Sequence, residues 1–173
     1  FKSLLSEVPG EIGIFREAYT KSTTLAGAVR HYVNALYGAE GLVVVDGDDR
    51  ELKRSLRPVV EDDLFHHSAN RLVSASNQKL EQLGFHPQVN PREINFFYLD
   101  NGVRGRLESN GKDFSVVDTS LRFSEEEIRK KLDETPEVFS PNVILRPLFQ
   151  EMILPNLAYV GGPAELVYWL ELK

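Results

Sequence analysis

The C-terminal stretch of the chain, on which we base the fold assignment, reads SPNVILRPLFQEMILPNLAYVGGPAELVYWLELK (residues 140–173). Within it, residues 157–160 form a short apolar run that leads into Gly161, Gly162 and Pro163. Proline suits the first turn of a helix, because the N–H that it lacks would have no partner there. The apolar residues that follow at helical spacing are Leu166, Trp169 and Leu170. This pattern predicts a strand, a tight glycine turn and a helix.

The start of this predicted helix is a candidate anion-binding site. Unpaired N–H groups at a helix start attract negative charge, and glycines such as Gly161 and Gly162 let a ligand approach the backbone closely. One partly buried helix end contributes on the order of 1 kcal/mol of charge preference, so it assists phosphate binding without defining it. The alternative is that the two glycines only make the turn.

A second candidate for anion binding lies upstream, where residues 143–154 are predicted to form a helix. Arg146 and Gln150 are four residues apart and therefore share a face, while Pro147 indicates a first turn or a kink. The planar fork of an arginine recognises carboxylate or phosphate better than a lysine does. The alternative is that Arg146 pairs with Glu151 or caps a backbone carbonyl.

Residues 42–46 (LVVVD) form a continuous β-branched run. Such a run is typical of a buried strand in a parallel sheet, and a strand between two helices is the pattern of an α/β fold. Ligands of open α/β sheets bind beyond the carboxyl ends of the strands, which makes Asp46 a candidate binding residue.

Asp46, Gly47 and Asp48 also weakly resemble the opening motif of haloacid-dehalogenase phosphatases, in which one aspartate is the nucleophile and the other an acid/base beside magnesium. The match is incomplete, because Arg50 stands where that class has threonine or valine. The simpler interpretation is that Asp48 and Glu51 form a capping box for the next helix.

The remaining elements follow from local signals. The run Lys21-Ser22-Thr23-Thr24 supplies N-cap candidates for a helix over residues 25–37, with Gly38 in a left-handed conformation at its end. Residues 51–84 read as a long helical stretch interrupted at Arg57-Pro58, with a packing seam of Leu64, Leu72 and Leu80.

The sequence between residues 85 and 118 changes to β-rich segments separated by turn signals. Asn101-Gly102 and Asn110-Gly111 predict the turns of an antiparallel meander. Ser124 and Glu127 then form a capping box for another helix. We therefore predict an α/β chain with three parts: a core segment over residues 1–84, an antiparallel β insertion over 85–120, and a second core segment over 121–173 that holds the Gly-Gly-Pro turn.

Composition limits the possible functions. The net charge of −6 and the lack of a Lys/Arg-rich run argue against binding to nucleic acid or to anionic membranes. The absence of cysteine excludes disulfides, cysteine-ligated zinc and a cysteine nucleophile, and the four histidines have no metal-ligand spacing. No apolar run approaches the ~18 residues of a membrane-spanning helix. The chain begins at Phe1 without methionine, and we expect it to be part of a longer protein.

Two blocks, residues 141–151 (PNVILRPLFQE) and 154–169 (LPNLAYVGGPAELVYW), resemble the bacillithiol-biosynthesis cysteine-adding enzymes (BshC). Residues 21–42 and the run that ends at Asp46 are also similar to that family. The resemblance runs over the whole chain but covers only a middle portion of a family member, without the N-terminal Rossmann strands and the C-terminal coiled coil.

The resemblance implies a Rossmann-like, nucleotidyltransferase-like core in a cytoplasmic ligase that adds cysteine to glucosaminyl malate, with ATP/ADP as co-substrate and a homodimer as the full-length form. No metal-binding residue is assigned, and both the metal requirement and the catalytic residues are unknown at this point. By matched motif, the residues at the substrate or nucleotide cleft would be Arg146, Gln150, Gly161, Gly162 and Glu165, together with Asp46. Arg146 would bind a carboxylate or phosphate, and Glu165 could receive an amino group. We expect this part to be inactive alone. A phosphatase and a non-catalytic helical interaction module remain the alternatives.

Overall fold

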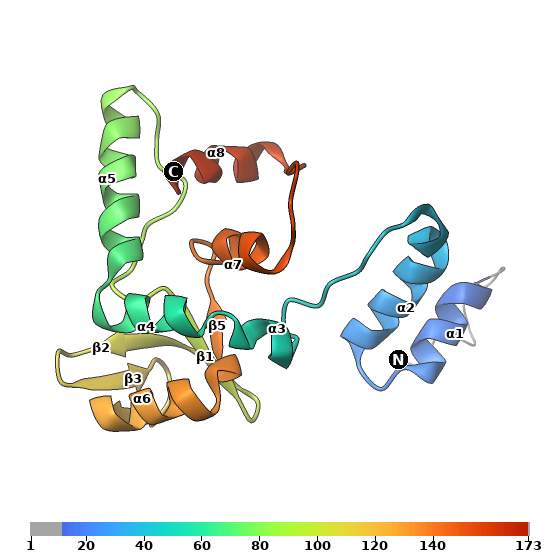
Figure 1. Cartoon of the computed structure of the whole chain (residues 1–173), viewed down its shortest axis with the longest axis horizontal. Coiled ribbons are helices and arrows are strands. Elements are labelled where there is room, and N and C mark those ends of the chain that lie inside the picture. The colour runs from blue at the N-terminus through green and yellow to red at the C-terminus, as the bar shows by residue number, and fades with distance from the viewer. Residues whose placement is uncertain (1–11, 173) are drawn as a thin grey trace. The chain divides into compact units, whose positions relative to one another are not determined.

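The computed structural model describes residues 12–172, and the chain divides into two compact units at residues 47 and 48 (Figure 1). The three-part division predicted above, with boundaries at residues 84 and 120, remains a prediction.

The N-terminal unit is a helical hairpin. Helix α1 (Gly13–Lys21) packs against helix α2 (Leu25–Tyr37), with Ala18 and Ala28 buried between them. The hydroxyl of Thr24 accepts the N–H of Gly27 at 3.0 Å, so Thr24 is the cap among the candidates in residues 21–24. A 3-10 turn, η2 (Gly38–Glu40), then continues from α2.

Two expectations for the end of this unit are wrong. Gly38 has a right-handed φ of −61°, because η2 continues the turn, and the left-handed residue is Gly41 at φ 86°. Residues 42–46 form no strand, and Val43 is 78% exposed. A strand requires hydrogen-bonded neighbours, and none of the described residues pairs with this run.

The second unit begins with three helices: α3 (Arg50–Arg54), α4 (Arg57–Phe65) and α5 (Ser68–Gln82). Asp49, and not Asp48, caps α3 by accepting the N–H groups of Glu51 and Leu52. A second break separates α4 from α5, where His67 adopts a left-handed φ of 52°. The predicted seam is therefore wrong, because this break turns Leu72 outward, to 62% exposure, while Leu64 is buried in α4.

A five-stranded antiparallel sheet forms the centre of the second unit, with the order β4-β3-β2-β1-β5. The strands are β1 (Phe96–Asp100), β2 (Val103–Ser109), β3 (Asp113–Val116), β4 (Arg122–Ser124) and β5 (Phe139–Pro141). Asn101 and Gly102 both have positive φ in the β1–β2 turn, which confirms the predicted hairpin. The predicted antiparallel meander is confirmed, and β4 and β5 extend it at its two edges.

The remaining elements are α6 (Glu125–Glu134), the 3-10 turn η3 (Pro136–Val138), α7 (Arg146–Ile153) and α8 (Pro163–Glu171). Ser124 and Glu127 form the predicted capping box of α6. Pro147 lies in the first turn of α7 and Pro163 in that of α8, as the sequence predicts. Residues 157–160 do not form the predicted strand: they have no strand partner, and Leu157 and Val160 are 102% and 95% exposed.

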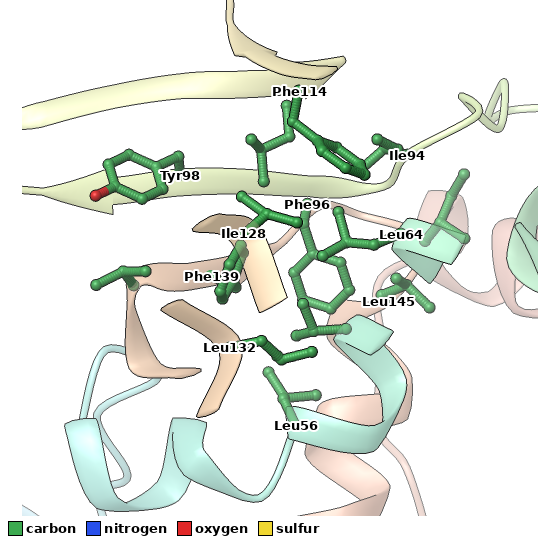
Figure 2. Close-up of a cluster of buried hydrophobic side chains, with 14 of the residues drawn as sticks. Leu56, Leu64, Ile94, Phe96, Tyr98, Phe114, Ile128, Leu132, Phe139 and Leu145 are labelled. Carbon is green, nitrogen blue, oxygen red and sulfur yellow. The ribbon is translucent and has the colours of Figure 1, made fainter. Parts of the chain in front are cut away.

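The hydrophobic core lies between one face of the sheet and the helices packed on it (Figure 2). Burial alternates along β2, where Gly105 and Leu107 face inward and the arginines on either side of Gly105 face outward. The core residues drawn in Figure 2 include Leu56, Leu64, Ile94, Phe96, Tyr98, Phe114, Ile128, Leu132, Phe139 and Leu145. The second unit is therefore mixed α/β, as predicted, but its described strands pair only in antiparallel fashion.

A buried polar network joins this core to helix α7. Asp63 of α4 is 1% exposed and accepts both the backbone N–H and the side-chain amide of Asn95, the second at 3.1 Å. The side-chain oxygen of Asn95 in turn accepts the amide of Asn142 at 3.1 Å. The carbonyl of Asn142 accepts the N–H of Arg146 at 2.9 Å, so the network ends at the first residue of α7.

We expect Gly105→Ala to destabilise the chain by about 1–3 kcal/mol, because overpacking displaces neighbouring atoms. A Cβ at Gly105 would lie 2.5 Å from Cγ1 of the buried Val116 and 2.8 Å from the carbonyl oxygen of Val117. Urea unfolding measures the change. Gly47→Ala is the control, since a Cβ there meets nothing within 4 Å. Equal stability of the two variants would contradict the prediction.

We expect Asp63→Asn to lower the free energy of unfolding by about 1–3 kcal/mol, because an amide would turn an N–H toward the donors of Asn95. Burial raises the pKa of Asp63 from 3.8 to about 6, against the opposing effect of the Asn95 hydrogen bonds. Between these values the folded state keeps a proton that the unfolded state has released, so stability falls as pH rises.

The advantage of the wild type over Asp63→Asn should therefore shrink as the pH rises from about 4 to about 6 and then stay constant. Urea unfolding of both proteins across this range measures the difference. Asp113→Asn, which changes an exposed carboxylate, controls for the titration of other acids. If the difference in unfolding free energy between the two proteins does not change between pH 4 and pH 6, the pKa of Asp63 is not raised.

Candidate functional site

Four of the predicted site residues meet between helices α7 and α8. Arg146 donates from Nη1 to Oε1 of Gln150 at 3.1 Å, along the helix face that their spacing predicts. Its Nη2 lies 3.7 Å from Oε1 of Glu165. Oε2 of Glu165 accepts the N–H of Gly162 at 3.3 Å, so Arg146 is linked to the glycine turn through one carboxylate.

Two tyrosines complete this group of residues, which we call the Arg146–Glu165 cluster. The hydroxyl of Tyr168 accepts Nη2 of Arg146 at 2.8 Å and donates to Oε1 of Glu165 at 3.2 Å. The hydroxyl of Tyr159 interacts with the same two charged groups, and its ring stacks on Trp169 at 4.5 Å. The cluster therefore consists of Arg146, Gln150, Tyr159, Glu165 and Tyr168.

The hydrogen bonds keep both charged groups ionised. Burial alone would lower the pKa of Arg146, but its hydrogen bonds with Tyr168 and Tyr159 outweigh burial and raise it. Hydrogen bonds from Tyr159 and from the N–H of Gly162 lower the pKa of Glu165. At neutral pH the cluster thus contains one cation and one anion.

Gly161 and Gly162 have different roles in the turn. A Cβ at Gly161 would lie 2.6 Å from the Tyr159 ring and 3.3 Å from the Glu165 side chain, whereas a Cβ at Gly162 would meet nothing within 4 Å. Glycine at position 161 therefore lets the backbone pass close to the cluster. The predicted anion site at the start of α8 faces the chain's own carboxylate, that of Glu165.

The structure does not bring all predicted residues together. Asp46 belongs to the N-terminal unit, whereas the other predicted site residues belong to the second unit. The carboxylate of Asp48 contacts Nζ of Lys53 at 2.9 Å, next to the Asp49 cap, and no strand precedes either residue. The surroundings that a haloacid-dehalogenase motif requires are therefore lacking in this part of the structure.

An apolar hollow of about 810 Å³ lies beside the cluster, between helices α4, α5, α7 and α8. Leu72, Val73, Leu148 and Trp169 are among its lining residues, and Arg146 and Glu165 are not. Sequence reasoning missed this hollow, because it depends on how four helices pack. It also missed Tyr168, although the spacing of three residues from Glu165 places both on one face of α8.

The structure contains no candidate metal centre within residues 12–172, where no three His, Cys, Asp or Glu side chains are grouped. Within the same range, no helix is long and apolar enough to cross a membrane.

The sequence model of a family described as "Bacillithiol biosynthesis BshC, N-terminal Rossmann-like domain" matches residues 6–173. The chain belongs to the BshC family. This description confirms the family resemblance and the Rossmann-like class predicted from the sequence. The BshC match includes both blocks on which the resemblance was based, and so covers the Arg146–Glu165 cluster.

Relatives in the BshC family support the same assignment. The chain is 46% identical over 158 residues to a protein of Cytophaga hutchinsonii, 47% over 160 to one of Flavobacterium psychrophilum, and 33% over 141 to one of Bacillus velezensis. Each is named "Putative cysteine ligase BshC". These matches cover 91%, 92% and 80% of this chain but 30%, 30% and 26% of the relatives. The chain thus spans less than a third of their length.

We expect Gly161→Ala to separate the Tyr159 ring from Trp169, because the new methyl group would overlap the tyrosine ring. Trp169 is the chain's only tryptophan, so its fluorescence reports on this contact directly. The emission should change in wavelength or intensity while far-ultraviolet circular dichroism stays the same. Gly162→Ala is the matched control and should leave the emission as in the wild type. Identical spectra for both variants would contradict this packing.

Proposed function

We propose that this chain is part of an enzyme that adds cysteine to glucosaminyl malate in bacillithiol biosynthesis, with ATP as co-substrate. Membership in the BshC family and the name cysteine ligase of its relatives support this activity. The observation that carries the proposal is the Arg146–Glu165 cluster, where a cation and an anion are held by two helices within reach of solvent.

A ligase that forms a C–N bond must first convert a carboxylate into a better acyl donor, and ATP cleavage can drive that step. Arg146 would hold a carboxylate or a phosphate, since a guanidinium fork binds either with two hydrogen bonds. Glu165 would accept an ammonium group, and Gly161 and Gly162 would bring the backbone close to the substrate.

The other parts of the proposal rest on the family resemblance. Asp46 is included as a substrate- or nucleotide-binding residue because the run that ends at Asp46 resembles the family; the strand that also suggested this role does not form. We also propose that residues 1–173 are inactive alone, and that the whole protein is a cytoplasmic homodimer with a coiled coil. Neither the phosphatase nor the helical interaction module is favoured, since the comparisons point to the ligase family.

We expect Arg146→Ala in the whole protein to lower kcat/KM for ligation by about 30-fold or more, because a charge-assisted contact to a carboxylate or phosphate contributes several kcal/mol. Product formation from cysteine, glucosaminyl malate and ATP, followed by mass spectrometry, measures the effect. Arg104→Ala is the control: Arg104 lies on β2, where its guanidinium stacks 4.1 Å from the Phe97 ring, outside the cluster. Unchanged ligation by Arg146→Ala would refute the proposed site.

A further inference from the structure

The Arg146–Glu165 cluster carries no net charge. Arg146 supplies one positive charge and Glu165 one negative charge, while the remaining members are a glutamine and two tyrosines. A polyphosphate or a dicarboxylate is bound best by an excess of positive charge, which these residues do not provide. A neutral pair of opposite charges instead complements a ligand that itself carries one charge of each sign.

Both charged side chains of the cluster are partly exposed. The side chains of Arg146 and Glu165 are 40% and 43% exposed, so both can be reached from solvent. Their charged atoms lie 3.7 Å apart, which is longer than a hydrogen bond, whereas the contacts of Arg146 with neutral partners are 2.8 and 3.1 Å. Arg146 and Glu165 are therefore held near each other without a close mutual hydrogen bond.

Tyr168 sets the separation of the two charges. Its side chain belongs to the core and is 8% exposed, so the position of its hydroxyl is fixed by packing. That hydroxyl accepts from Arg146 and donates to Glu165, which uses both of its hydrogen-bonding roles. Because it lies between the two groups, it restrains the direction in which each of them points.

Building on the proposed function, we infer that the cluster binds the amino-acid substrate as a zwitterion. The α-carboxylate would lie on Arg146 and the α-ammonium group on Glu165, and Tyr168 would be the positioning residue that holds the two apart. Of the three substrates, cysteine is the one that carries an ammonium group and a carboxylate on the same carbon atom. Glucosaminyl malate and ATP would then be bound by other residues of the whole protein.

Calorimetric titration of the whole protein tests this inference with three probes: cysteine, 3-mercaptopropionate, which lacks the amine, and cysteamine, which lacks the carboxylate. We expect cysteine to bind about 10-fold or more tightly than either analogue, since each analogue can contact only one of the two charges of the cluster. Glu165→Gln should weaken cysteine binding by about 10-fold or more and leave 3-mercaptopropionate unaffected. Arg146→Ala should weaken the binding of cysteine and of 3-mercaptopropionate by about 10-fold or more and should not weaken that of cysteamine.

Two further variants separate positioning from folding. Tyr168→Phe removes only the hydroxyl. It should weaken the binding of cysteine more than the binding of either singly charged analogue, because only cysteine depends on the spacing of both charges. Glu151→Gln is the matched control for Glu165→Gln. Glu151 is an exposed glutamate of α7, and its Oε1 accepts a hydrogen bond from Nδ2 of Asn156 at 2.7 Å. This control should bind all three probes as the wild type does.

The result that overturns the inference is also distinct from failure of the proposed function. If the variants lose affinity for glucosaminyl malate or ATP and keep that for cysteine, the cluster is a substrate site but not the amino-acid site. If no probe or substrate responds to either charge substitution, both proposals fail. Equal losses for cysteine and both analogues would indicate a purely structural cluster and would also overturn the inference.

Discussion

The hydrogen bonds that Asp63 accepts from Asn95 connect the core of this chain to its candidate site. A carboxylate that is 1% exposed is costly to bury unless its oxygens are satisfied, and here both oxygens accept from one asparagine. Asn95 precedes β1 and its side chain accepts from Asn142, which follows β5. Since the carbonyl of Asn142 accepts the first N–H of α7, the orientation of the helix that carries Arg146 depends on this buried acid.

The sequence signals that predicted structure correctly are those that are satisfied within a few residues. The Thr24 cap, the Ser124 capping box and the Asn101-Gly102 turn each depend on atoms three or four positions apart, so a single sequence contains the whole interaction. The two predicted core strands, residues 42–46 and 157–160, failed for the opposite reason. A strand depends on a partner elsewhere in the chain, and an apolar β-branched run does not specify one.

In the candidate site, too, contacts within one helix were predicted and contacts between elements were not. Arg146 and Gln150 were predicted to share a face because their spacing fixes it within one helix. The link from Arg146 to Glu165 crosses between two helices, and only the motif resemblance brought the two residues together beforehand. Tyr168 and Tyr159 were not predicted at all, because nothing in their spacing indicates that α8 and the loop before it pack against α7.

Helix α8 is restrained mainly at its C-terminal half, which bears on how well the site is pre-formed. Glu171 is fully buried and accepts the N–H groups of Gln88 and Val89 at 2.6 and 3.1 Å, and Tyr168 is part of the core. Glu165 lies one turn before Tyr168 on the same rigid element, so its backbone position is set by contacts that no ligand has to make. A site held by packed helices needs less ordering when a ligand binds than one built on loops, and this reduces the entropic cost of recognition.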